Sequence, residues 1–163
     1  MINPTSEFVA HDLNVKCMTI GSKSYELFAT GGEDGRLNIW RIGSRGNVFS
    51  LDKKNKSPIL SACFNYDEQY IASGNQSGTI KILDLTEGKL ARNLNCHQVG
   101  VTSIHYHQYG DFIASGSLDC TMKVWDIRNK TCLQTYTGHS KPITCVRFSP
   151  ACDQKGAGGY VAP

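Results

Sequence analysis

A short β-hairpin pattern occurs three times in this chain. Each copy has two apolar runs on either side of a polar turn, which predicts a pair of antiparallel strands. The copies lie at residues 27–40, 70–83 and 112–127, and the equivalent positions Trp40, Leu83 and Trp125 are 43 and 42 residues apart. In the third copy, successive residues of the second run carry apolar side chains on both faces. This predicts strands packed between neighbours, within a repeat architecture.

The spacing and the closing residues resemble those of one family. A period of about 40–45 residues that ends in Trp-Asp is typical of WD-repeat blades, which have four strands each. The third copy ends in Trp-Asp at residues 125–126, the second keeps the Asp and the first keeps the Trp. On these residues the chain resembles the WD-repeat family over residues 7–150. The resemblance implies an all-β fold, a WD40-type β-propeller with three four-stranded blades and the first strand of a fourth.

The domain organisation follows from the repeats. We expect a lead-in at residues 1–6, a partial propeller at 7–150 and a non-repeat tail at 151–163. The repeats are assigned to residues 11–52, 53–94, 95–137 and 138–150. Because a propeller closes with about 4–8 blades, this set is expected to expose apolar surface and strand edges. We interpret the sequence as a fragment, a truncated splice form or a mis-assembled gene model.

Two repeats carry the residues of a buried polar tetrad that the family resemblance implies. The third repeat has His97, Ser115, Asp119 and Trp125, and the first has His11, Thr30, Asp34 and Trp40. In each tetrad the imidazole can bridge a carboxylate and a hydroxyl, and the hydroxyl can accept from the indole N–H. The second repeat lacks the pattern, since Ser77 and Leu83 replace the Asp and the Trp. We expect apolar packing to hold that blade, and a structural role for both tetrads.

Composition and motifs argue against several functional classes. The formal charge of +3 does not by itself indicate a nucleic-acid partner, and no apolar run approaches the length of a membrane span. Seven cysteines without C-x-x-C spacing indicate reduced thiols of an intracellular protein rather than a disulfide framework or a zinc site. His105 and His107 supply only two possible metal ligands. No catalytic motif is present, so we expect no enzyme, no cofactor and no metal; an enzymatic alternative would depend on Cys120 or His105.

A partner-binding face is expected where the hairpin turns and the loops between repeats meet. Lys53, Lys54 and Lys56 form a basic run in the loop that enters the second repeat. This loop is either a solvated segment or a contact for an acidic surface such as tubulin. The family resemblance places the loop and the turns on one face of the disc. The expected face consists of Glu33, Lys53, Lys54, Lys56, Gln76, Leu118 and Lys141.

A narrower resemblance rests on longer motifs. The chain is similar to the N-terminal propeller of the regulatory, non-catalytic subunit of katanin at residues 8–12, 27–34, 37–40, 76–78, 109–117 and 123–128. This implies ATP-dependent microtubule severing, in which an AAA ATPase partner cuts and the propeller targets the complex to centrosomes or spindle poles. Implied partners are therefore tubulin or microtubules, centrosome or spindle-pole proteins, and the katanin ATPase subunit.

In that family the ATPase subunit binds a C-terminal helical region, which this sequence does not contain. The implied location is the cytoplasm and the cytoskeleton, with no nucleic-acid and no membrane partner. The alternative is a generic WD-repeat adaptor, such as the substrate receptor of a ubiquitin ligase.

Overall fold

The computed structural model describes residues 8–44, 46–51, 57–108 and 110–149. In these residues the chain folds into three antiparallel sheets of four strands each, without a helix. The first sheet contains β1 (Val15–Ile20), β2 (Leu27–Gly32), β3 (Leu37–Arg41) and β4 (Asn47–Leu51). The middle sheet contains β5 (Ile59–Phe64), β6 (Tyr70–Asn75), β7 (Thr79–Asp84) and β8 (Lys89–Asn95). The third sheet contains β9 (Val101–Tyr106), β10 (Phe112–Ser117), β11 (Met122–Asp126) and β12 (Thr131–Tyr136). The all-β fold with three four-stranded sheets is therefore confirmed.

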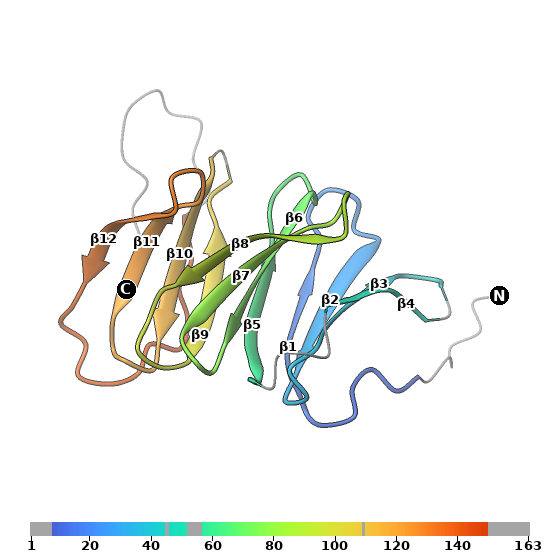
Figure 1. Ribbon diagram of the computed structural model, residues 1–163, viewed down its shortest axis with the longest axis horizontal. Coiled ribbons are helices and arrows are strands. Elements are labelled where there is room, and N and C mark those ends of the chain that lie inside the picture. Colours follow the sequence, from blue (N-terminus) through green and yellow to red (C-terminus); the bar gives the residue numbers. More distant parts are fainter. Residues whose placement is uncertain (1–7, 45, 52–56, 109, 150–163) are drawn as a thin grey trace.

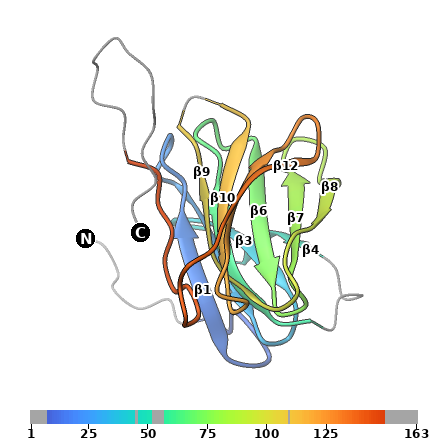
Figure 2. The ribbon, with the colours of Figure 1, turned by 90° about the vertical axis from the view of Figure 1, so that its left-hand side faces the viewer.

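Each sheet is a simple meander, in which every strand pairs with the next one along the chain. The sheets stand side by side along the long axis of the molecule (Figure 1). Their first strands are neighbours, because β5 contacts both β1 and β9. In Figure 2 these first strands lie toward one side, while β4 and β8 lie toward the other. The sheets are thus arranged like consecutive blades around an axis beside β1, β5 and β9.

The apolar core lies between the sheets. One cluster joins the first and middle sheets and includes Leu37, Ile39, Ile71 and Leu83. The other joins the middle and third sheets and includes Ile80, Ile82, Ile113 and Trp125. Both faces of the middle sheet are therefore covered, which explains why its strands carry apolar residues at consecutive positions.

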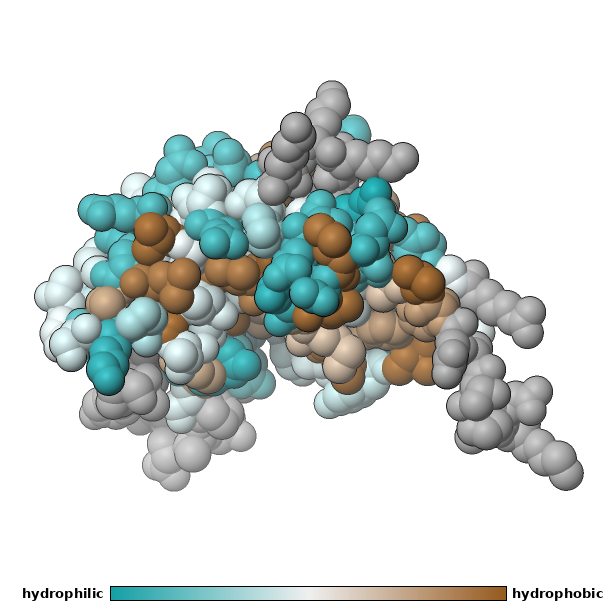
Figure 3. Space-filling view, turned by 90° about the horizontal axis from the view of Figure 1, so that it is seen from below, coloured by the Kyte–Doolittle hydropathy of each residue, from teal (hydrophilic) through white to brown (hydrophobic). Residues whose placement is uncertain are grey.

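Some strands of the two end sheets are less buried than those of the middle sheet. In β1 every residue is exposed or half-buried, whereas β5 and β9 each have at least three buried residues. All residues of β12 are exposed. Met18 and Leu133 are examples of large apolar side chains that stay accessible. Seen from below, apolar residues are exposed in several patches along the molecule (Figure 3).

The segment expected to begin a fourth blade runs beside β9 without forming a regular strand. Only Phe148 makes an isolated bridge. The Val146 N–H donates to Ser103 Oγ at 3.0 Å, and the Phe148 N–H donates to His105 Nδ1 at 3.1 Å. These bonds go to side chains rather than to a backbone ladder. A regular strand needs a paired strand beside it, and the described residues include none for this segment.

Several expected features fall outside the described residues: the lead-in, the basic residues Lys53, Lys54 and Lys56, and the tail at 151–163. No membrane-crossing helix occurs in the part of the chain that the structure describes.

Candidate functional site

Two groups of hydrogen-bonded side chains hold hairpin turns of the end sheets in place. In the first sheet the group comprises His11, Thr30, Asp34 and Trp40, which we call the first tetrad. His11 Nδ1 lies 2.9 Å from Asp34 Oδ1, and its Nε2 lies 2.9 Å from Thr30 Oγ1. The Trp40 indole N–H donates to Thr30 Oγ1 at 2.9 Å. The ring of Phe8 covers that indole, with 4.6 Å between the ring centroids.

The third sheet repeats this arrangement in a second tetrad of His97, Ser115, Asp119 and Trp125. His97 Nδ1 lies 2.9 Å from Asp119 Oδ2, and its Nε2 lies 2.8 Å from Ser115 Oγ. The Trp125 N–H donates to Ser115 Oγ at 3.1 Å. Asp119 also accepts from the N–H and the hydroxyl of Thr121, which closes the β10–β11 turn. The structure thus brings the four residues of each expected tetrad together.

The charges of the second tetrad follow from its surroundings. Burial would raise the pKa of Asp119, but the Thr121 hydrogen bonds and the neighbouring His97 lower it to about 2. Burial lowers the pKa of His97, and this effect outweighs the opposing effect of Asp119. At neutral pH the carboxylate is therefore charged and the imidazole neutral. With its proton on Nδ1, the imidazole donates to Asp119 and accepts from the Ser115 hydroxyl, an assignment made from the hydrogen-bond network.

The middle sheet closes its turn with a residue that the sequence comparison missed. Asn75 is 4% exposed, and its Oδ1 accepts from the backbone and hydroxyl of Ser77 and of Thr79, at distances from 2.9 to 3.2 Å. This amide closes the β6–β7 turn as Asp119 closes the β10–β11 turn in the third sheet. Leu83, at the Trp position, is 1% exposed in the core between the first two sheets. An Asn at the end of β6, where the other copies have Gly32 and Ser117, was the available signal.

Three of the expected partner-binding residues occupy equivalent positions. The backbone N–H groups of Glu33, Gln76 and Leu118 donate to the carbonyls of Asn14, Pro58 and Gly100, each at 2.9 Å. Each bond ties a hairpin turn to the segment just before the first strand of the same sheet. Lys141 is exposed and lies two residues before Ile143, whose N–H donates to the Ser117 carbonyl. We call the surface formed by Glu33, Gln76, Leu118 and Lys141 the turn face.

The turn face has a charged group at Glu33 and an exposed apolar side chain at Leu118. Glu33 pairs with Lys16 at 2.6 Å, and the hydrogen bond from Lys16 is the main cause that lowers the pKa of Glu33. Leu118 is 40% exposed, and the side chains of Leu118 and Leu60 both lie beside Gly100. These groups suit recognition of another protein, since an exposed Leu beside fixed polar groups offers both burial and orientation.

Of the two residues weighed as possible reactive groups, Cys120 lies in the β10–β11 turn, two residues from Leu118, and His105 lies on β9. His105 Nδ1 accepts from the Phe148 N–H at 3.1 Å. Burial raises the pKa of Cys17 to about 11 and that of Cys96 to about 12, so both are protonated thiols at neutral pH. In the described ranges, no group of three or more His, Cys, Asp or Glu residues is placed to hold a metal ion.

Comparisons with known proteins agree with this architecture. The sequence model of the anaphase-promoting complex subunit 4 WD40 domain matches residues 21–108 and 96–151. Mitochondrial division protein 1 of Vanderwaltozyma polyspora is 23% identical over 175 residues, 88% of this chain and 25% of that protein. Two katanin p80 WD40 repeat-containing subunit B1 homologues of Arabidopsis thaliana are 42% and 45% identical over 72 residues. That match covers 44% of this chain and 6% and 8% of those proteins.

A solved structure gives the same architecture. The RRP9 WD40 repeats superpose with a TM-score of 0.80 at 19% identity, over 85% of this chain and 43% of that one. At this identity the likeness shows the fold alone. This chain spans 25% of the length of the yeast protein and 32% of human angio-associated migratory cell protein, which is 26% identical over 143 residues.

Proposed function

The chain belongs to the WD40-repeat family, and from this premise we propose that it is a non-catalytic scaffold that binds a protein partner through its turn face. The observation that carries the proposal is the repeated backbone hydrogen bond that fixes Glu33, Gln76 and Leu118 at equivalent positions. Tetrads in the end sheets and Asn75 in the middle sheet hold the same turns from below. A rigid surface loses less conformational entropy on binding than a mobile surface does. The fixed turns therefore favour a partner-binding role.

For the partner, we propose a role like that of the katanin regulatory subunit. The identity to the two Arabidopsis thaliana homologues, 42% and 45%, exceeds the 23% to the yeast protein, although it covers 44% of this chain. Together with the motifs in the first and third hairpins, this supports a place in ATP-dependent microtubule severing, with the ATPase subunit as the cutting partner. The proposed location is the cytoskeleton, at centrosomes or spindle poles.

The first test is co-sedimentation of the purified chain with stabilised microtubules. We expect saturable binding that Leu118→Ser weakens, because this substitution removes the exposed apolar side chain of the turn face. Leu133→Ser is the matched control: Leu133 is 53% exposed on β12, away from the turns, and its loss should leave binding unchanged.

Microtubule binding that both substitutions leave unchanged would contradict the turn face as the contact. Failure to bind microtubules would contradict the katanin-type role. Direct binding of a purified cullin adaptor instead would support the alternative of a ubiquitin-ligase substrate receptor.

A further inference from the structure

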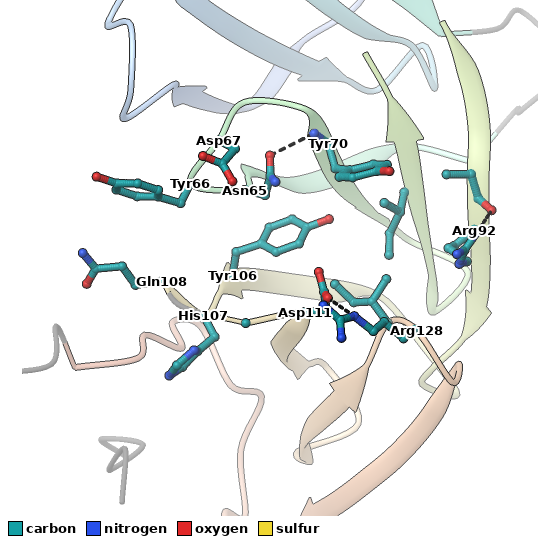
Figure 4. A pocket seen from close by; sticks show the side chains of 14 residues that line it. Asn65, Tyr66, Asp67, Tyr70, Arg92, Tyr106, His107, Gln108, Asp111 and Arg128 are labelled. Carbon is teal, nitrogen blue, oxygen red and sulfur yellow. Dashed lines mark hydrogen bonds and ion pairs between the residues drawn. The ribbon is translucent and has the colours of Figure 1, made fainter. Parts of the chain in front are cut away.

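A cavity of about 620 Å³ opens between the middle and third sheets, at the opposite strand ends from the turn face. Tyr70 begins β6 on this side, whereas Gln76 follows the other end of that strand. Residues 65–67 of the β5–β6 turn and residues 107, 108, 110 and 111 between β9 and β10 line it, together with residues of β7 and β8. Tyr66, Tyr70 and Tyr106 give it aromatic walls (Figure 4). A half-open hollow of this size, with aromatic walls and several convergent polar groups, is a candidate ligand site.

Two buried polar groups of this cavity have no hydrogen-bond partner among the described residues. They are the hydroxyl of Tyr106, a residue that is 7% exposed, and the Nε–H of Arg92. The Tyr106 ring lies in the middle of the cavity, and its hydroxyl points toward the side on which Arg92 lies (Figure 4). A buried polar group without a partner is destabilising, and a ligand that supplies the partner recovers that energy.

The charges around the cavity leave one cation to be balanced. At the rim, Asp111 pairs with Arg128, and Asp67 lies 3.6 Å from Lys23 of the first sheet. Arg92 Nη1 donates to the Ala91 carbonyl at 2.9 Å. Within the described part of the chain, no carboxylate pairs with the Arg92 guanidinium. The site therefore favours a single negative charge, and the rim carboxylates disfavour a polyanion such as a nucleotide.

We propose that this cavity binds an acidic side chain from an extended segment of a protein partner. A guanidinium and a phenol both donate hydrogen bonds, and a carboxylate accepts from both in the strong, charge-assisted geometry. In the bound state Arg92 Nε–H and the Tyr106 hydroxyl donate to the carboxylate, and Tyr66 and Tyr70 flank the adjoining peptide. This site goes beyond the proposed function, since it needs no partner on the turn face.

The test is a titration of the ¹⁵N-labelled full chain with N-acetyl-Ala-Glu-Ala-amide, followed by NMR. We expect saturable shifts of the Arg92 Nε–H signal and of backbone signals near Tyr66 and Tyr106. Arg92→Met keeps the side-chain stem and should weaken binding about ten-fold or more, as loss of a charged hydrogen-bond donor does. Arg36→Met, which removes a guanidinium paired with Asp12 in another region, should leave it unchanged.

Two further measurements separate a carboxylate site from nonspecific adsorption. The matched peptide with Gln in place of Glu should bind about ten-fold more weakly. Tyr106→Phe keeps the buried ring and should weaken the Glu peptide by a few-fold, which gives a second reading if Arg92→Met does not fold. No saturable shift with the Glu peptide, equal affinity for the two peptides, or unchanged binding by a folded Arg92→Met variant would overturn the proposal.

Discussion

A chain of four hydrogen-bonding groups leads from the indole of Trp125 to the carboxylate of Asp119. The indole donates to Ser115, the serine hydroxyl to His97, and the imidazole to the aspartate. Every donor in this order meets an acceptor, so the buried polar groups are all satisfied. The first tetrad has the same order, with Thr30 in place of Ser115. Both tetrads join the core of a sheet to the turn above it.

We predict that Asp119→Ala lowers the free energy of unfolding by about 1–3 kcal/mol at pH 7, because it leaves His97 and the Thr121 N–H without their acceptor. The pKa of Asp119 is about 2 in the folded chain, against the ordinary value of 3.8 that applies to the unfolded chain. A depressed pKa stabilises the fold above pH 3.8, and that contribution is lost as the pH falls toward 2. Urea unfolding at pH 7 and at pH 2.5 should therefore show a smaller effect of the substitution at the lower pH.

The control for this prediction is Glu87→Ala, which removes a carboxylate whose recorded ion pair is a 3.9 Å contact with Lys89. That variant should unfold at the same urea concentration as the unaltered chain. An unchanged midpoint for Asp119→Ala at pH 7 would contradict the structural role of the second tetrad.

Sequence comparison could locate both tetrads because each member recurs at a fixed place in the repeat. Sequence comparison could not find Asn75, since this residue closes its turn from a different position in the repeat. A side chain that starts at the end of β6 accepts the turn N–H groups that an aspartate in the turn accepts elsewhere. Position-by-position comparison therefore shows the loss of the Asp and Trp, but not the residue that compensates for it.

At the scale of elements, a single carboxylate joins the turns of two sheets. Glu68, in the β5–β6 turn, accepts the N–H groups of Lys23 and Ser24 at 2.6 and 2.7 Å, and the Ser24 hydroxyl at 2.7 Å. Lys23 and Ser24 belong to the β1–β2 turn of the first sheet. Burial would raise the pKa of Glu68, but the hydrogen bonds from Ser24 and Lys23 lower it. The contact is therefore strongest with the carboxylate charged.

We predict that Glu68→Gln speeds amide hydrogen exchange at Lys23 and Ser24, because a neutral amide oxygen is a weaker acceptor than a carboxylate. In the unaltered chain, protection at these two amides should be full above the ordinary pKa of a glutamate. It should fall as the pH drops through the lower, folded pKa. Exchange measured by NMR between pH 3 and 6 checks both expectations. Glu26→Gln, a nearby exposed change, should leave protection intact; equal protection in Glu68→Gln and the unaltered chain would contradict the contact.

The segment before Ser149 shows where an element cannot be predicted from its own residues. Its sequence favours a strand, yet it binds β9 through side chains and remains irregular in the described residues. A side-chain hydrogen bond also links the first strands of the middle and third sheets, since Ser61 Oγ donates to the Val101 carbonyl at 2.8 Å. Strand propensity is local, whereas a ladder depends on a partner strand.

At the scale of the whole molecule, burial depends on the position of a sheet in the series. The middle sheet has core clusters on both faces, while the first and third have one each. The repeat pattern made this stacking predictable, because the apolar residues on both faces of each strand require neighbours. The cavity at Arg92 and Tyr106 was not predictable in this way. Its walls come from two repeats, and the sequence does not show which of their side chains meet.

The central claim is that turns from three separate repeats act as one binding surface. Hydrogen–deuterium exchange of the chain with and without microtubules tests it most directly. The account predicts slower exchange in the microtubule complex at residues 33–36, 76–79 and 118–121 together. Protection elsewhere in the chain with none at these three turns would contradict it.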